Sequence, residues 1–215
     1  MPTLTDLVGP AGPLEALLDE PDTTPLRAAV VFAHPHPQFG GTLHTKVVYQ
    51  GAKALARIGC AVLRFNFRGV GRSAGSFSGG PGEMDDFRAA LDYMTGRYSS
   101  ARLWSAGFSF GAWVALESGA QDDRVSALIG IAPPVATSIS GQKYTFEHTL
   151  RSTKPKFFVQ GEADDVCPLE AMWAFYAKVP EPRELVVIDA ADHLFEGKTQ
   201  EVGEALEDLL ADFYG

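Results

Sequence analysis

Short apolar runs alternate with longer amphipathic stretches along this chain. The runs have the length of buried strands, and most are bounded by glycine, proline or aspartate. They cover residues 4–8, 14–18, 28–33, 61–65, 103–106, 127–131, 157–160 and 185–188. Helical spacing of the apolar positions predicts helices at residues 46–58, 82–97, 110–120, 168–178 and 199–213. This alternation predicts an α/β fold in which helices cover both faces of a mainly parallel sheet.

Two segments refine the predicted architecture. The turn at residues 9–13, rich in glycine and proline, predicts that the first two strands form an antiparallel hairpin at one edge of the sheet. The longest stretch without clear periodicity, residues 132–155, leaves room for only a small cap over the sheet. We find no internal repeat or low-complexity segment, and we therefore expect a single domain over residues 1–215.

Composition and charge narrow the classes of function. With 215 residues, 46% of them hydrophobic, the chain can bury one substantial core. A formal net charge of −9 and the lack of a basic cluster argue against nucleic acid or an anionic membrane as a partner. The sequence shows no basic and apolar leader pattern and no run of 18 apolar residues, so we expect a cytoplasmic location. Cys60 and Cys167 agree with a reducing compartment, in which we expect no disulfide.

A serine stands between a predicted strand and a predicted helix, in the sequence Gly107-Phe108-Ser109-Phe110-Gly111. A sharp turn from strand to helix strains the backbone of its central residue, and small neighbours leave room for the crossing elements. Because such a turn exposes the hydroxyl, the pattern favours Ser109 as a nucleophile. The motif alone is also compatible with an ordinary loop.

A serine nucleophile needs an imidazole that takes its proton and a carboxylate that orients the imidazole. Asp164 follows the predicted strand at residues 157–160, and His193 follows the strand at residues 185–188. Both positions fall at the carboxyl edge of a parallel sheet, where open α/β sheets hold their active sites. We therefore predict a triad of Ser109, His193 and Asp164. Its activity should rise with pH through the range in which histidine titrates.

Asp164 and His193 each have a simpler alternative role that does not involve catalysis. Asp164 could start a loop or cap the helix that begins near Pro168, although Asp165 is better placed as that cap. Glu162 is a rival acid, but its position ahead of Asp164 favours a side chain that faces solvent. His193 could be an exposed loop histidine, yet of the five histidines it alone follows a strand downstream of Asp164.

The loop after the strand at residues 28–33 reads His-Pro-His-Pro-Gln-Phe-Gly-Gly. Acyl transfer requires two backbone N–H groups that stabilise an oxyanion, one from the residue after the serine and one from this loop. Phe110 supplies the first N–H group. Because proline has no N–H, the second must come from His36, Gln38 or Phe39, and we favour His36.

Other candidates for chemistry are weaker. His34, His36 and His44 invite a metal site, but no third ligand stands at a persuasive spacing and the prolines stiffen the loop. We therefore predict no metal and no cofactor. Arg68 and Arg72 could clamp a substrate carboxylate, although bracing of loops is the more common use of such arginines.

These residues resemble those of the α/β-hydrolase superfamily, specifically the small dienelactone-hydrolase-like branch with a His-Pro-His-Pro-x-x-Gly-Gly loop. The resemblance covers nearly the whole chain, at residues 34–41, 63–73, 107–111, 161–168 and 192–193. It implies an α/β-hydrolase fold of about eight strands with minimal or no lid, a triad of Ser109, His193 and Asp164, and an oxyanion hole at Phe110 and the His36 loop. Dienelactone hydrolases use cysteine where this chain has Ser109, so their particular lactone cleavage is not implied.

The expected function is a serine hydrolase that acts on a small-molecule ester through an acyl-enzyme. With little lid, we expect short to medium acyl chains and no activation at lipid interfaces. Phe39, Phe108 and Tyr144 are candidates for contact with substrate. Two alternatives stay open, a peptidase or amidase with the same triad and a non-catalytic binding module on the same fold. The sequence leaves the oligomeric state undetermined.

Overall fold

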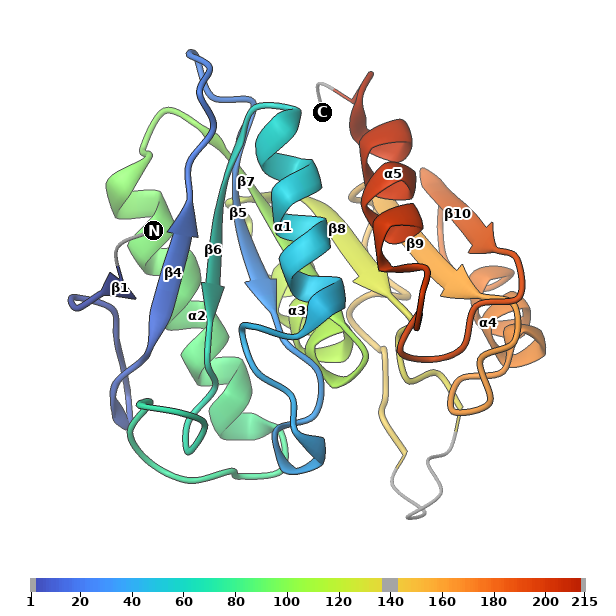
Figure 1. Cartoon of the computed structure of the whole chain (residues 1–215), viewed down its shortest axis with the longest axis horizontal. Coiled ribbons are helices and arrows are strands. Elements are labelled where there is room, and N and C mark those ends of the chain that lie inside the picture. The colour runs from blue at the N-terminus through green and yellow to red at the C-terminus, as the bar shows by residue number, and fades with distance from the viewer. Residues whose placement is uncertain (1–2, 137–142, 214–215) are drawn as a thin grey trace.

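A twisted sheet runs through the centre of the computed structural model, which describes residues 3–136 and 143–213 (Figure 1). Within these residues eight strands form the sheet, in the order β1-β4-β6-β5-β7-β8-β9-β10. They are β1 (Thr3–Leu4), β4 (Ala16–Asp19), β5 (Ala28–Ala33), β6 (Cys60–Phe65), β7 (Arg102–Phe108), β8 (Val125–Ile131), β9 (Lys156–Gly161) and β10 (Arg183–Ile188). From β6 to β10 all neighbours pair in parallel, whereas β4 pairs antiparallel with β1 and β6. The predicted α/β fold with a mainly parallel sheet is confirmed.

Helices cover both faces of this sheet. In Figure 1, α1 (Lys46–Arg57) and α5 (Thr199–Leu210) lie in front of it, and α2 (Pro81–Arg97) and α3 (Phe110–Gln121) lie behind. The short α4 (Leu169–Tyr176) packs into the same core as α2 and α3. Side chains along β5 alternate between the two faces of the sheet. Val30 and Phe32 belong to the core under α1 and α5, whereas Ala29 and Val31 belong to the core on the opposite face. Each fully buried large apolar side chain contributes about 1.5–3 kcal/mol.

The first 19 residues depart from the expected pair of strands. The run at residues 4–8 breaks into β1 and β2 (Val8–Gly9), and the run at residues 14–18 gives the single strand β4. β1 pairs with β4, whereas β2 forms a separate hairpin with β3 (Gly12–Pro13), which lies in the predicted turn. Pro13 cannot donate to a ladder, which ends the small hairpin there. The antiparallel pairing at one edge is nevertheless as predicted.

The structure describes only part of the segment in which the sequence leaves room for a small cap. Of residues 132–155, positions 137–142 lie outside the described residues, and the described remainder contains no helix or strand. Among the described residues, no helix is long and apolar enough to cross a membrane.

Both cysteines are buried free thiols. Burial raises the pKa of Cys60 to about 12 and that of Cys167 to about 11. Each thiol therefore stays protonated at neutral pH, and neither has the low pKa of a reactive cysteine.

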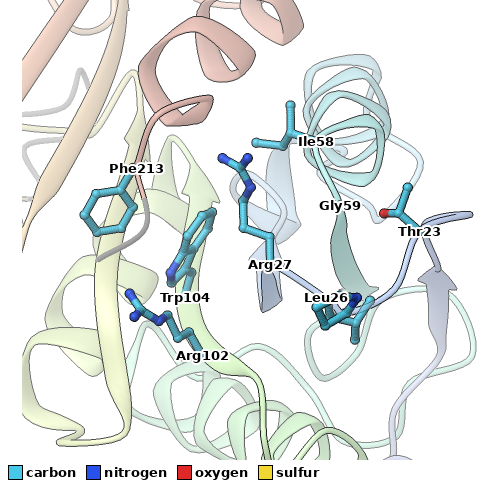
Figure 2. A pocket seen from close by; sticks show the side chains of 9 residues that line it. Thr23, Leu26, Arg27, Ile58, Gly59, Arg102, Trp104 and Phe213 are labelled. Atoms are coloured by element: carbon cyan, nitrogen blue, oxygen red, sulfur yellow. The ribbon is translucent and has the colours of Figure 1, made fainter.

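The amino edge of the sheet is tied to the last helix by Arg27, which precedes β5. Its Nη1 donates to the carbonyl oxygens of Leu210 and Ala211, both at 2.6 Å. The last carbonyls of a helix lack partners within the helix, so this arginine caps α5. Figure 2 shows the Arg27 side chain extending toward that helix.

Candidate active site

The turn between β7 and α3 holds Ser109 in a strained conformation, with φ 54° and ψ −120°. A Cβ at Gly107 would approach the carbonyl oxygen of Gly111 to 2.1 Å, and a Cβ at Gly111 would approach that of His34 to 2.4 Å. Both contacts are too short for any side chain, which explains the two glycines of the motif. The turn presents the Ser109 side chain at the carboxyl edge of the sheet.

Three side chains form a continuous hydrogen-bonded chain at this edge. Ser109 Oγ lies 2.9 Å from His193 Nε2, and His193 Nδ1 lies 2.8 Å from Asp164 Oδ2. A carboxylate only accepts hydrogen bonds, so Nδ1 carries a proton and Nε2 accepts from the serine hydroxyl. The residues come from the turn after β7 and the loops after β9 and β10. The structure thus brings together the three side chains singled out in the sequence.

Four donors hold the carboxylate of Asp164, which is 3% exposed. Oδ1 accepts from the N–H groups of Val166 (2.9 Å) and Cys167 (2.7 Å), and Oδ2 accepts from Gln160 Nε2 (3.0 Å) as well as from His193. Such charge-assisted bonds fix the orientation of the carboxylate. The sequence analysis missed Gln160, although a polar residue that closes an apolar strand was a usable signal.

The rival acidic residues have other roles. Glu162 is exposed and accepts a hydrogen bond from the N–H of Ala190 at 2.9 Å. Asp165 does not cap the following helix, because the N-cap of α4 is Pro168 and no side chain caps it. The prediction that Asp165 is that cap is wrong, because Asp165 lies three residues before the N-cap.

Phe108, expected to contact substrate, lies in the core instead. Its side chain has no exposed surface, and its ring centroid is 5.5 Å from that of His193 and 6.2 Å from that of Phe195. The alternation of side chains along β7 directs Phe108 into the core under α1 and α5. We therefore correct this expectation: Phe108 supports the imidazole from the protein interior.

Two backbone N–H groups near Ser109 have no acceptor among the described residues, those of Phe110 and His36. Phe110 opens α3, so no carbonyl of a preceding turn is available to it. In the facing loop, the N–H of Gln38 donates to His36 Nδ1 (3.2 Å), and that of Phe39 donates to the carbonyl oxygen of His36 (3.1 Å). Of the three loop candidates for an oxyanion donor, only His36 keeps its N–H available.

His34 has a structural role in the same loop. Nδ1 donates to the carbonyl oxygen of Pro35 (2.6 Å), and Nε2 accepts from the N–H of Phe67 (3.0 Å). Burial lowers the pKa of His34 to about 4, so the ring is neutral and joins the loops after β5 and β6. His44 is exposed. In the part of the chain that the structure describes, no group of three or more His, Cys, Asp or Glu residues could hold a metal ion.

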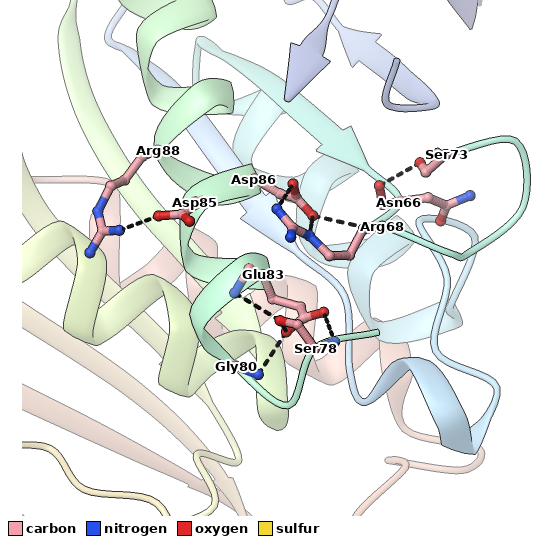
Figure 3. A network of polar contacts seen from close by, with 10 residues as sticks. Asn66, Arg68, Ser73, Ser78, Gly80, Glu83, Asp85, Asp86 and Arg88 are labelled. Atoms are coloured by element: carbon pink, nitrogen blue, oxygen red, sulfur yellow. Dashed lines mark hydrogen bonds and ion pairs between the residues drawn. The ribbon is translucent and has the colours of Figure 1, made fainter. Parts of the chain in front are cut away.

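A polar network shapes the loop between β6 and α2 (Figure 3). Arg68 Nε and Nη2 donate to the two carboxylate oxygens of Asp86, at 2.9 and 2.7 Å. Buried Glu83 accepts from the N–H groups of Ser78 (2.9 Å) and Gly80 (2.7 Å). Arg68 thus braces the loop, and its fork is engaged by a buried carboxylate rather than open to a substrate.

Aromatic rings line one side of the site and form what we call the aromatic wall. They belong to His36, Phe39, Phe77, Phe110, Trp113 and Tyr144, with neighbouring centroids 4.7 to 5.9 Å apart. Phe39 is 80% exposed and Tyr144 is half-buried, so both keep surface for an apolar group. Phe77 was missed in the sequence, because its loop has no periodic pattern.

Comparison with known proteins assigns the chain to a family. Residues 26–214 match the family model described as an alpha/beta hydrolase domain. An uncharacterized protein of Rickettsia prowazekii is 35% identical over 208 residues, which cover 94% of this chain and 86% of that protein.

Two solved structures share both sequence and fold with this chain. An α/β serine hydrolase homologue from Coxiella burnetii is 38% identical, with a TM-score of 0.88 over 97% of each chain. A Xanthomonas campestris protein, described as an α/β serine hydrolase without a lid, is 36% identical, with a TM-score of 0.86 over 96% of this chain and 92% of that one. The protein belongs to the α/β-hydrolase family.

Proposed function

We propose that this protein is a serine hydrolase that cleaves carboxylic esters of short to medium acyl chain length. The observation that carries the proposal is the hydrogen-bonded chain from Ser109 through His193 to Asp164, with distances of 2.9 and 2.8 Å. This chain is similar to a serine hydrolase homologue from Coxiella burnetii and to a serine hydrolase from Xanthomonas campestris, which supports the same class of reaction.

In the proposed reaction, Ser109 Oγ attacks the ester carbonyl carbon while His193 Nε2 takes the hydroxyl proton. The Asp164 carboxylate stabilises the imidazolium and keeps its orientation. His193 then gives the proton to the departing alkoxide oxygen, which leaves as an alcohol while the acyl group stays on Ser109. A water attacks this acyl-enzyme, His193 takes its proton and returns it to Ser109 Oγ, and the carboxylic acid departs.

The negative oxygen of each tetrahedral intermediate would accept hydrogen bonds from the N–H groups of Phe110 and His36. The positive end of the α3 dipole, at Phe110, favours negative charge at the same place. Loss of one such donor typically slows an enzyme by about 10²–10³-fold.

The aromatic wall supports a preference for esters with an apolar group of modest size. Phe39 and Tyr144 offer apolar surface beside Ser109, and the similar Xanthomonas protein has no lid that would enclose a long chain. Esters such as p-nitrophenyl acetate and butyrate are therefore suitable first substrates.

The test compares hydrolysis of these two esters by the wild type, Ser109→Ala and Ser99→Ala. Ser99 is an exposed serine beyond the end of α2 and serves as a matched control. We expect the Ser109 variant to lose several orders of magnitude in turnover while its melting temperature is retained, and the Ser99 variant to match the wild type. Equal turnover by Ser109→Ala and wild type would refute the proposed nucleophile.

A second comparison separates an esterase from an amidase. An amine is a poorer leaving group than an alcohol and requires more effective protonation by His193. We expect p-nitrophenyl butyrate to be cleaved far faster than its amide, p-nitrobutyranilide. Cleavage of the anilide at the rate of the ester would instead identify an amidase.

A further inference from the structure

A cavity of about 360 Å³ opens at the amino edge of the sheet (Figure 2). Its walls come from the segment before β5, the turn between α1 and β6, the start of β7 and the segment after α5. Arg102 begins β7, and Ser109 follows the other end of that strand. At the rise of a strand, about 3.3 Å per residue, these two residues are roughly 20 Å apart. The cavity is therefore separate from the candidate active site.

Two guanidinium groups give this cavity a positive character. Arg102 is exposed, and among the described residues it has no hydrogen-bond or ion-pair partner. Arg27 adds a second positive charge from a fixed position, because its Nη1 is anchored on the carbonyl oxygens of Leu210 and Ala211. In a protein with a net charge of −9, the Arg102 guanidinium creates a local preference for an anion.

Apolar side chains supply part of the cavity wall. Trp104 and Phe213 lie with ring centroids 5.5 Å apart, and Leu26 and Ile58 contribute to the walls. Figure 2 shows the indole of Trp104 between the side chains of Arg27 and Arg102.

The indole also offers a polar group that nothing described satisfies. Trp104 Nε1 is buried and has no hydrogen-bond acceptor among the described residues. A buried donor without an acceptor is unfavourable. Because this atom has almost no solvent-accessible surface, a ligand in the cavity contacts the neighbouring side chains rather than this donor.

We propose that this cavity binds a small molecule with a single carboxylate and an apolar body. The carboxylate pairs with Arg102, whose planar guanidinium offers two parallel donors. The apolar body lies against Leu26, Ile58 and Phe213, which are partly exposed in the cavity wall. A more highly charged ligand fits less well, because one Arg102 guanidinium balances one negative charge and the apolar side chains of the wall desolvate the rest. A volume of about 360 Å³ falls within the range of small-molecule pockets.

The test is calorimetric titration of the wild type with 4-phenylbutyrate and with its neutral amide. We expect saturable binding of the acid, and at least tenfold weaker binding of the amide, because only the acid can form the ion pair. Arg102→Met, which keeps the length of the side chain without its charge, should weaken binding of the acid at least tenfold. Arg102→Lys should retain most of it.

Matched controls separate this site from the candidate active site. Arg88→Gln changes an exposed arginine outside the cavity and should leave binding unchanged. Ser109→Ala should also bind the acid as the wild type does, and the Arg102 variants should hydrolyse p-nitrophenyl butyrate at the wild-type rate. The proposal is overturned if the wild type binds no 4-phenylbutyrate, if the amide binds equally well, or if Arg102→Met binds as tightly as Arg102→Lys.

Discussion

At the scale of single residues, the candidate site depends on backbone groups as much as on side chains. A strained φ of 54° holds Ser109 at the turn after β7, and Asp164 is held in part by the N–H groups of Val166 and Cys167. The sequence identified the three polar residues because each directly follows a predicted strand. The roles of Gln160 and Phe108 were missed, although a polar residue near the end of an apolar strand and the alternation of side chains along β7 were local signals for them.

The oxyanion donor can be tested by removing its N–H group. His36 has φ −54° and ψ 123°, values that proline adopts. Both His36→Ala and His36→Pro lose the imidazole, but only the proline variant loses the N–H. We expect kcat for p-nitrophenyl butyrate to fall about 10²–10³-fold further in His36→Pro than in His36→Ala. Equal rates in two variants with similar melting temperatures would show that another group stabilises the oxyanion.

Because His34 is buried in its neutral form, we expect the protein to lose stability in acid. Because burial lowers the pKa of His34 from 6.5 to about 4, the unfolded chain takes up a proton on this residue at a higher pH than the folded protein does. The free energy of unfolding is unaffected by His34 above pH 6.5 and decreases as the pH falls toward 4. This contribution reaches about 2–3 kcal/mol.

Denaturant unfolding at pH 7 and pH 4.5 measures this contribution. His34→Gln removes the titrating ring, so the variant should lose less free energy of unfolding between the two pH values than the wild type, whatever its stability at pH 7. An identical loss in both proteins would show that His34 is protonated as readily in the folded state as in the unfolded one.

At the scale of elements, the strands that are buried were the ones best predicted from the sequence. The strands β5 to β9 are largely buried and therefore have continuous apolar runs in the sequence, and the half-buried β10 has a shorter one. The predicted bounds of all six differ from the observed ones by at most two residues. The two-residue strands near the start of the chain are defined by pairing with distant segments, which a local pattern does not encode. The loop that carries Phe77 owes its shape to the buried contacts of Glu83 and Asp86, which also leave no periodic signal.

The turn between β7 and α3 offers a stability test at this scale. A Cβ at Gly111 would meet the carbonyl oxygens of His34 and Ala33 at 2.4 and 2.6 Å, so Gly111→Ala must displace the turn. We expect a loss of about 1–3 kcal/mol or more in the free energy of unfolding, together with loss of esterase activity.

Gly96→Ala is the matched control for Gly111→Ala. Gly96 lies in α2, where a Cβ would meet nothing within 4 Å, so alanine should stabilise this helix by about 0.5–1 kcal/mol. Thermal and denaturant unfolding measure both changes. Unimpaired stability of Gly111→Ala would contradict the tight packing of the turn.

At the scale of the whole molecule, the candidate active site and the cavity lie at opposite edges of one sheet. The carboxyl edge holds Ser109, His193 and Asp164, and the amino edge holds the cavity beside Arg102. The sequence predicted the first, because its residues follow strands in a recognisable order. It could not predict the second, because a cavity forms between segments that are far apart in the chain.

The proposed open site for short acyl chains should need no lipid interface for activity. We expect hydrolysis of p-nitrophenyl butyrate to follow ordinary saturation through the solubility limit of the substrate, and we expect p-nitrophenyl palmitate to be cleaved more slowly than the butyrate. A steady-state rate series over chain length and concentration measures both. A sharp rise in rate at the solubility limit, or faster cleavage of the palmitate, would contradict an open site for short chains.

The most direct test of the central claim is covalent labelling with a fluorophosphonate, followed by mass spectrometry of the intact protein and its peptides. The account predicts one adduct per chain, on the peptide that contains Ser109, with no adduct in Ser109→Ala and much slower labelling in His193→Ala. An adduct on another residue, or labelling that persists in Ser109→Ala, would contradict the assignment of Ser109 as the nucleophile.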